Sequence, residues 1–321
     1  MSYVHEDPAF GDLLRIVAEQ RRLALALVEK DYWVTHALWA VHAQGFDVWF
    51  KGGTSLSKGF GLIERFSEDL DLKIEPGHQA QMPRVGSWKS EGPQATAERR
   101  TSFEWLATNL RVPGATVRLD GGRAETQAWR TADLHILYPA LRAATLPPGM
   151  KPYVLLELGN ARVMPFVPRP ISSFVHDHLA QAGLLAAYDD NRPRAVRCVH
   201  PLVTLLEKLD ALARKAPRAD AEAATYVRHY EDAARIIRAL GALPPLPEHG
   251  DVRTLAAEMT AQRQLARVPV ADDVAFEPSR LGHARQLHRA YVEVGPMFWG
   301  PRLSLDEAGT TIRGWIRTSL S

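Results

Sequence analysis

The sequence has little of what marks secreted, membrane-spanning or strongly polyanion-binding proteins. Its single cysteine, Cys198, excludes an internal disulfide and fits a reducing compartment. No apolar run approaches the roughly 18 residues of a transmembrane helix. The polar start, with His5, Glu6 and Asp7, is unlike a secretory signal. The formal net charge is only +2, so the overall charge of the chain does not indicate nucleic-acid binding. We expect a globular, cytoplasmic protein without membrane contact.

Hydrophobic patterning divides the chain into a mixed N-terminal half and a helical C-terminal half. Its 321 residues, 46% of them apolar, are enough for two domains. Alternating or short apolar runs predict strands at 47–51, 69–74, 116–119, 133–138 and 153–158. The expected fold class is α+β, with a mixed-sheet domain over 1–170 and an all-α domain over 171–321.

Helical spacing of apolar residues surrounds these strands. Steps of three and four residues predict helices over 8–43, 98–110, 202–214, 221–240, 251–264, 281–292 and 305–320. The stretch 75–97 is rich in Pro, Gly, Gln and Ser and is expected to be a mobile loop. Three prolines within 164–170 favour a linker or an edge strand.

A glycine pair follows the first predicted strand. Gly52 and Gly53 come directly after Lys51 and precede Thr54 and Ser55, and we expect Thr54 to cap a short helix. Glycines lack a Cβ and let a phosphate approach the backbone closely. A helix start adds free N–H groups and the positive end of its dipole, and the hydroxyls add donors. The pattern is typical of a phosphate-binding turn.

Two aspartates follow fourteen residues after Ser55. Asp69 and Asp71 are separated by one residue in a predicted strand, so both carboxylates face the same side. Like charges this close need a cation, and Mg²⁺, or Mn²⁺ in its place, takes one or two carboxylates plus substrate phosphates. Alone, a glycine pair is usually a turn and an Asp-x-Asp is usually surface. Together, in this order, they predict an NTP site and in-line attack on the α-phosphate with pyrophosphate leaving.

Five stretches carry a family likeness. Three are highly specific: VEKDYWV (28–34), FKGGTSLSK (50–58) and RFSEDLDL (65–72). Two are weaker alone: TLLEKL (204–209) and RHYED (228–232). Together they resemble the AbiEii/AbiGii toxin family of nucleotidyltransferase-like proteins, which includes the MenT toxins. The likeness spans roughly residues 25–240. The family often continues RHxxD with an aromatic and then an apolar residue, where this chain has Ala233 and Ala234.

The resemblance implies a polymerase-β-type fold and metal-dependent transfer of NMP from an NTP, in some members to the 3′ end of tRNA. It also implies a toxin with a neighbouring antitoxin protein, in a toxin–antitoxin or phage-defence system. Lys51 and Lys58 join the glycine pair as nucleotide-binding candidates. Lys208 is implied to hold the nucleotide phosphates, and Asp232 to orient Lys208 or a substrate group. On pattern alone, Lys208 is a lysine snorkelling at a helix edge and Asp232 a partner of a nearby arginine.

Two further residues have open interpretations. Glu157 is an acid within the apolar run Val154–Leu158, which costs free energy unless it is paired or binds metal. It is a candidate third carboxylate and base, as polymerase-β-type sites commonly have, or an edge residue paired with a residue such as Arg162. Ser67 precedes Asp69 by two residues, so an extended chain turns its hydroxyl to the same side, toward a carboxylate or phosphate. The alternative is a simple turn residue.

The remaining candidates are weaker. The segment 192–218 is either a candidate RNA surface or a solvated helix face, and Arg99 and Arg100 could extend such a surface. Against two acids it holds seven basic residues: Arg192, Arg194, Arg197, Lys208, Arg214, Lys215 and Arg218. His176 and His178 are expected on a loop or helix surface rather than on zinc. Cys198 has no obvious base nearby and is expected to be structural.

Three functions remain open on this basis. The leading hypothesis is a nucleotidyltransferase that acts on RNA, tRNA included, as the toxin of a toxin–antitoxin or phage-defence pair. A second keeps the same site but places the nucleotide on a protein hydroxyl. A third is a degenerate fold that only binds nucleotide or RNA, against which the intact set Gly52, Gly53, Asp69, Asp71 and Lys208 argues.

Overall fold

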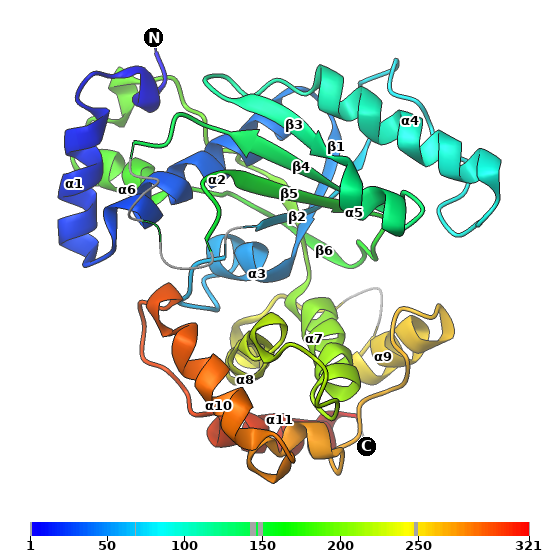
Figure 1. The fold of residues 1–321 in the computed structure, drawn as a ribbon. Helices are drawn as coiled ribbons and strands as arrows, with labels where there is room; N and C mark the ends of the chain where they lie inside the picture. The colour runs from blue at the N-terminus through cyan, green and yellow to red at the C-terminus, as the bar shows by residue number, and fades with distance from the viewer. Residues whose placement is uncertain (1, 68, 142–145, 147–149, 247–249, 321) are drawn as a thin grey trace. The chain divides into compact units, whose positions relative to one another are not determined.

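The structure, a computed structural model, describes residues 2–67, 69–141, 146, 150–246 and 250–320 (Figure 1). Chain contacts gather them into two compact units. The first comprises Met1–Gly59, Ser67–Val163 and Pro168–Cys198, and the second Phe60–Phe66, Met164–Val167 and Val199–Ser321. Glu68, part of one of the specific stretches, lies outside the described residues. None of the described helices combines the length and apolar character that a bilayer crossing requires.

A mixed sheet organises the first unit. Its strands are β1 (Asp47–Lys51), β2 (Asp69–Glu75), β3 (Thr116–Asp120), β4 (Thr131–Leu137), β5 (Val154–Gly159), β6 (Phe166–Arg169) and β7 (Val196–Val199). In the described residues these seven strands run in the order β3-β4-β5-β2-β1-β7-β6. At the centre, β2 pairs antiparallel with β1 and parallel with β5. Buried and partly exposed residues alternate along β1 and β2, so their polar side chains share the face opposite the apolar ones.

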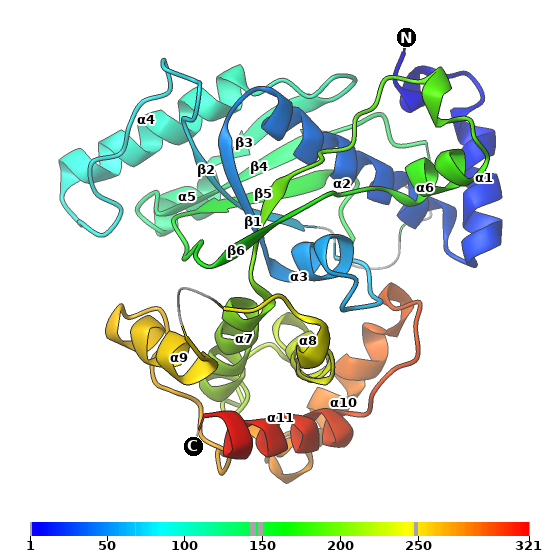
Figure 2. The same ribbon diagram turned by 180° about the vertical axis from the view of Figure 1, so that it is seen from behind.

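Helices of the first unit pack on this sheet and on one another. They are α1 (Phe10–Arg21), α2 (Leu25–Ala43), α3 (Gly52–Thr54), α4 (Pro93–Asn109), α5 (Gly121–Thr126) and α6 (Phe174–Gln181). Helix α2 lies over the centre of the sheet, against β1, β2 and β5 (Figure 2). Helices α1 and α6 pack on α2, α4 contacts β3, and α5 contacts β4. Because neighbours surround it, α2 is buried on nearly all sides.

The second unit is helical apart from short connections. Its helices are α7 (Pro201–Lys215), α8 (Arg228–Arg238), α9 (Val252–Ala261), α10 (Ala284–Glu293) and α11 (Leu305–Ser319). Helix α8 packs against both α7 and α11. Local sequence marks the helix starts: Pro201 occupies the first turn of α7, and Ser304 and Glu307 form a capping box at α11.

The α+β expectation, a mixed sheet followed by an all-α region, is confirmed. The stretch 8–43 forms two helices rather than one, because Arg22 adopts a left-handed conformation that ends α1. The sequence patterns missed the helices α5 and α6 and the short strand β7. The expected boundary at 170 differs from the contact-based division, because α6 packs on α1 and α2 and β7 pairs with β1.

Two neutral histidines, His36 on α2 and His176 on α6, are built into the core. The ring of His176 hydrogen-bonds Ser173 through Nδ1 and the Asn191 side-chain oxygen through Nε2, at 2.7 and 2.6 Å. The Asn191 amide donates to His36 Nδ1 at 2.7 Å, and His36 Nε2 donates to the carbonyl of Pro113 at 2.9 Å. Burial lowers the pKa of both histidines to about 4. The expectation of a surface position is therefore wrong for His176, which is buried.

This network predicts loss of stability in mild acid. The folded chain keeps His36 and His176 neutral down to about pH 4, whereas the unfolded chain binds protons below about pH 6.5. The contribution of the two neutral rings to the free energy of unfolding is therefore complete above pH 6.5 and decreases as the pH falls toward 4. Between pH 7 and pH 5 the loss is about 1–2 kcal/mol per ring. Urea unfolding at the two pH values measures this. His176→Gln should reduce the difference and His78→Gln, at an exposed position, should not. Equal differences in both variants would contradict the assignment.

Candidate active site

Gly52 lies directly against the carboxylate of Asp71. It follows the last residue of β1 and has φ of +73°, a conformation that favours glycine. The register of β1 with β2 pairs Lys51 with Asp71. A Cβ on Gly52 would overlap the Asp71 carboxylate. Glycine is therefore required here twice, for its backbone angle and for the space that the acid occupies.

Cross-strand pairing arranges charged side chains in one row. Asp71 on β2 is the register partner of Lys51 on β1 and of Glu157 on β5. Glu157 in turn opposes Asp133 on β4, and Asp133 opposes Asp120 on β3. Register partners share a face and stand about 5 Å apart. The row is therefore a line of acids with a lysine at one end.

One arginine neutralises the far part of this row. Arg123 comes from α5, which begins after Asp120 caps it through the Gly122 amide. Its guanidinium forms an ion pair with Glu157 and lies 3.2 Å from the Asp133 carboxylate. Burial raises the pKa of Asp133, and Arg123 opposes that shift. The partner of Glu157 is thus Arg123 rather than Arg162, and Glu157 as a third carboxylate and base stays a prediction.

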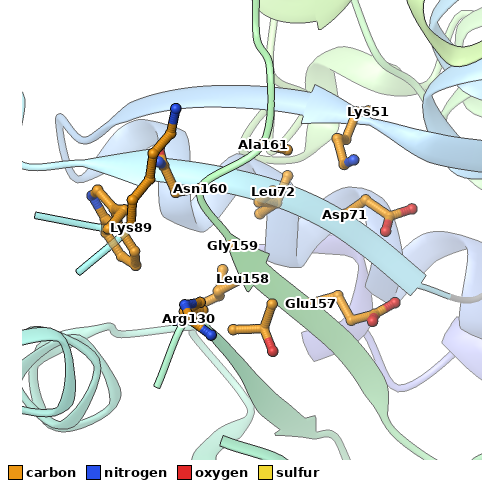
Figure 3. Close-up of a pocket in the computed structure, with 12 residues that line it drawn as sticks. Lys51, Asp71, Leu72, Lys89, Arg130, Glu157, Leu158, Gly159, Asn160 and Ala161 are labelled. Atoms are coloured by element: carbon orange, nitrogen blue, oxygen red, sulfur yellow. The ribbon is translucent and has the colours of Figure 1, made fainter. Parts of the chain in front are cut away.

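A pocket opens beside these acids within the first unit. It has a volume of about 350 Å³. Lys51, Asp71 and Glu157 lie at one side, and Lys89, Asn160 and Arg130 lie at the opposite side (Figure 3). The pocket therefore joins an acidic end to a basic end.

The carboxylates of the site fit a divalent cation that takes the rest of its ligands from the substrate and from water. Asp69 and Asp71 occupy alternate positions of β2 and so face the same side. Among the described residues no group of three or more His, Cys, Asp or Glu side chains could hold a metal ion. Mg²⁺ commonly uses one or two carboxylates and completes its shell with water and substrate phosphates. Two carboxylates beside a turn without Cβ suit that arrangement, and their role as metal ligands stays a prediction.

The side chain of Thr54, which follows the glycine pair, contacts the backbone at the start of β2 and so helps to hold that strand. Thr54 ends α3 instead of capping it, because Lys51 occupies the N-cap position. The buried Thr54 hydroxyl lies 3.0 Å from the carbonyl of Ser67 and 2.6 Å from that of Asp69. Ser67 precedes β2, and its nucleotide contact stays a prediction, as do those of Gly53 and Ser55. A contact from Thr54 would have to come from its backbone, since its side chain is engaged.

Lys58 belongs to the scaffold. It lies in the last turn of the π-helical segment η2 (Ser55–Gly59), and its Nζ lies 2.5 Å from Asp31 on α2 and 2.9 Å from the Ser172 carbonyl. Asp31 also accepts from the Phe174 amide at 2.8 Å. The side chains of both ions are nearly buried, so Lys58 fastens the turn to α2, and its contact with a nucleotide stays a prediction.

The specific stretch 28–34 is likewise structural. Glu29 accepts from the Leu141 amide at 2.7 Å, and Lys30 donates to the Lys151 carbonyl at 2.6 Å. Both are buried, as is Asp31. A buried charge is tolerated only when it is paired or hydrogen-bonded, which these three are. This stretch therefore belongs to the core helix α2, which packs against the sheet.

A buried ion cluster centres on Asp232 in the second unit. Arg65 binds its carboxylate with two hydrogen bonds of 2.8 Å, and Lys208 Nζ adds a third of 2.8 Å. His229 lies 3.4 Å from the same Nζ. The geometry agrees with Asp232 orienting Lys208, and a contact of Lys208 with nucleotide phosphates stays a prediction.

Opposite charges set the protonation states in this cluster. Burial alone would raise the pKa of Asp232, but Arg65 and Lys208 outweigh it and hold that pKa well below its usual range. Burial lowers the pKa of Lys208, with Asp232 opposing the shift. Burial and the neighbouring Lys208 also keep the pKa of His229 well below its usual value. One carboxylate therefore holds two cations beside a neutral imidazole.

The basic segment 192–218 is largely paired with acids. Carboxylate partners within 3 Å are Asp190 for Arg192 and Arg194, Asp47 for Arg197, Asp210 for Arg214, and Asp220 for Arg218. The segment is also divided between the two units. These pairs weaken the case for an RNA surface here. Arg99 is buried and cannot extend such a surface.

Cys198 is structural, as expected. It is buried, and burial raises the pKa of its thiol to about 12. A thiol with that pKa is not a nucleophile near neutral pH.

The sequence patterns missed Arg123 and the basic side of the pocket. Arg123 has only the preceding Gly121-Gly122 pair as a local signal. Trp88, Lys89 and Arg130 lie in two segments without periodicity, about forty residues apart. Their meeting in the pocket depends on long-range packing.

The Asp232 cluster predicts a large stability effect. Asp232→Asn would leave the buried Arg65 and Lys208 without their counter-charge, which costs about 3–5 kcal/mol. Urea unfolding of Asp232→Asn against the exposed control Asp220→Asn measures it. The control should behave like the wild type. A loss no larger in Asp232→Asn than in the control would show that the two cations do not depend on this carboxylate.

Comparison with known proteins agrees with the sequence likeness. The family model described as "Nucleotidyl transferase AbiEii toxin, Type IV TA system" matches residues 37–293. No curated protein matches the sequence. The match covers the sheet with its glycine turn and acids, as well as the Asp232 cluster. The chain therefore belongs to the AbiEii nucleotidyltransferase toxin family and is a nucleotidyltransferase.

Proposed function

We propose that the protein transfers NMP from an NTP to RNA, tRNA included, in a reaction that depends on Mg²⁺ or Mn²⁺. The observation that carries this is the contact of Gly52 with the Asp71 carboxylate, beside the acids of β2 and β5. This contact supports a site in which the substrate phosphates lie against the glycine backbone, which has no Cβ, and close to the carboxylates. When bound, the metal would neutralise charge on the phosphates and stabilise the transition state.

The chain's own groups account for the rest of the proposal. Asp69 and Asp71 would hold the metal, and the Lys51–Ser55 turn would receive the β- and γ-phosphates. The acceptor hydroxyl oxygen attacks the α-phosphorus, the bond from the α-phosphorus to the bridging oxygen breaks, and pyrophosphate leaves. Glu157 would accept the hydroxyl proton. Lys51 adds positive charge at the Asp71 end of the row.

We also propose that the activity is that of a toxin with a cognate antitoxin protein. The family description, a toxin of a type IV toxin–antitoxin system, supports this. A role in phage defence would follow from the same pairing. The RNA acceptor rests on the family resemblance and on the basic side of the pocket.

Label transfer tests the proposed reaction. Each α-³²P-labelled NTP is incubated with the protein, Mg²⁺, total RNA and total protein, and one nucleotide should label an RNA band. Asp69→Asn and Asp71→Asn should each lower the rate by about 100-fold or more, because the metal supplies several kcal/mol. Asp220→Asn serves as control. Near wild-type transfer by Asp71→Asn would contradict the proposed site, and label on protein alone would favour the protein-hydroxyl hypothesis.

A further inference from the structure

From Lys51, Asp71 and Glu157 the pocket extends along β2 and β5, away from the glycine turn at Gly52 and Gly53. Strand β2 runs antiparallel to β1, so Leu72 and the residues after it lead away from Gly52. Strand β5 is parallel to β2 and leads the same way, to Gly159. Leu72 and Gly159 both line the pocket. In-line transfer requires the attacking hydroxyl to approach from the side opposite the leaving pyrophosphate. With phosphates at the glycine turn, the part of the pocket beyond Asp71 and Glu157 is where an acceptor enters.

The far end of the pocket offers an aromatic ring and two cations. Trp88 is partly exposed, and the ring of Phe103 on α4 supports it edge to face, with centroids 5.7 Å apart. Lys89 follows it in the chain, and Arg130 lines the same pocket. Arg130 pairs at 2.9 Å with Glu91, whose side chain is 87% exposed. An exposed pair of this kind is weak and exchanges readily for a phosphate.

A single buried side chain holds both parts of this end in place. Arg99 on α4 donates to the carbonyls of Ser87 and Ser90, on either side of Trp88 and Lys89, at 2.8 and 3.0 Å. It also donates to the carbonyl of Ala128 at 2.9 Å, two residues before Arg130. The loop expected to be mobile is therefore anchored at this point.

The turn before Arg130 is conformationally costly. Ala128 and Trp129 have φ of +48° and +59°, a left-handed conformation that costs non-glycine residues about 1–2 kcal/mol each. Trp129 is buried, and the Arg100 guanidinium lies 5.5 Å from its ring centre. Packing therefore maintains a strained turn whose next residue reaches the pocket.

We propose that Trp88, Lys89 and Arg130 form the subsite for the acceptor strand. The terminal base of a single-stranded RNA stacks on Trp88, and its backbone phosphates lie against Lys89 and Arg130. A ring with an accessible face beside two cations suits a nucleotide chain, whereas a protein hydroxyl needs neither. The inference rests on the proposed function and adds the acceptor's binding groups to it.

Oligonucleotide binding tests the subsite without catalysis. A fluorescent single-stranded RNA of eight nucleotides is titrated with wild type, Trp88→Ala, Trp88→Phe and the matched control Trp105→Ala. Trp105 also lies edge to face with a phenylalanine, Phe46, and does not line the pocket. Trp88→Ala should weaken binding on the order of tenfold, the usual effect of removing one stacked base. Trp88→Phe should recover most of it, and the control should bind like the wild type with a similar change in Tm.

Salt dependence tests the two cations. Lys89→Gln and Arg130→Gln should each reduce the slope of log affinity against log salt by about 0.7, the value for one phosphate contact on a single strand. Arg84→Gln, on the same loop and outside this pocket, should leave the slope unchanged. Unchanged slopes in the first two variants would overturn the phosphate contacts.

Transfer kinetics separate this inference from the function beneath it. If the wild type labels RNA, Trp88→Ala should raise KM for RNA and leave KM for the NTP unchanged. A rise in KM for the NTP alone would place the nucleotide's base on Trp88 and overturn the acceptor assignment. Wild-type RNA affinity and KM in Trp88→Ala would overturn the inference while leaving the function intact. If the wild type labels only protein, both fail.

Discussion

The crowding of carboxylates on one face of the sheet is the constraint on which the rest of the structure depends. Asp71, Glu157, Asp133 and Asp120 are neighbours across four strands. Ionised side chains about 5 Å apart repel one another unless cations lie among them. Arg123 serves the Glu157–Asp133 end, and Lys51 lies at the other. Under the proposed function, a metal ion at Asp69 and Asp71 would complete this balance.

The Asp232 cluster solves the opposite problem. There one buried carboxylate stands among the cations Arg65 and Lys208. Such a cluster is weak evidence of stability in itself, since desolvation offsets much of the attraction. Its geometry is fixed, however, because three charge-assisted hydrogen bonds of 2.8 Å meet on one side chain. This rigidity is suited to presenting a lysine in one defined orientation.

Local patterns predicted the parts of the site that lie close together in the chain. The alternation in β2 placed Asp69 and Asp71 on one face, and the glycine pair marked the turn that Asp71 covers. The same patterns did not reveal that the side chains of Lys58 and Thr54 contact the scaffold, because polar residues near a site have the same local signal whether they face a ligand or the scaffold. Only packing reveals that Asp31 neutralises Lys58.

Long-range contacts were beyond the sequence. The pairing of Glu157 with Arg123 depends on the register of β4 and β5 and on the short helix α5. The meeting of Trp88 with Arg130 depends on Arg99, whose buried side chain joins two loops through backbone carbonyls. The local sequence pattern around an arginine does not show whether its side chain is buried, as that of Arg99 is, or lies on the surface.

The most direct test of the account is metal binding at the glycine turn. Mn²⁺ is titrated by calorimetry into the protein together with a non-hydrolysable NTP analogue. Mn²⁺ binding should require both the nucleotide and the two aspartates, because carboxylates and phosphates together supply the ligands of the metal. Asp71→Asn should abolish this binding. Gly52→Ala, whose added Cβ displaces the Asp71 carboxylate, should do the same. Gly314→Ala, in open space on α11, should bind as the wild type does. Unchanged Mn²⁺ affinity in Asp71→Asn would contradict the account.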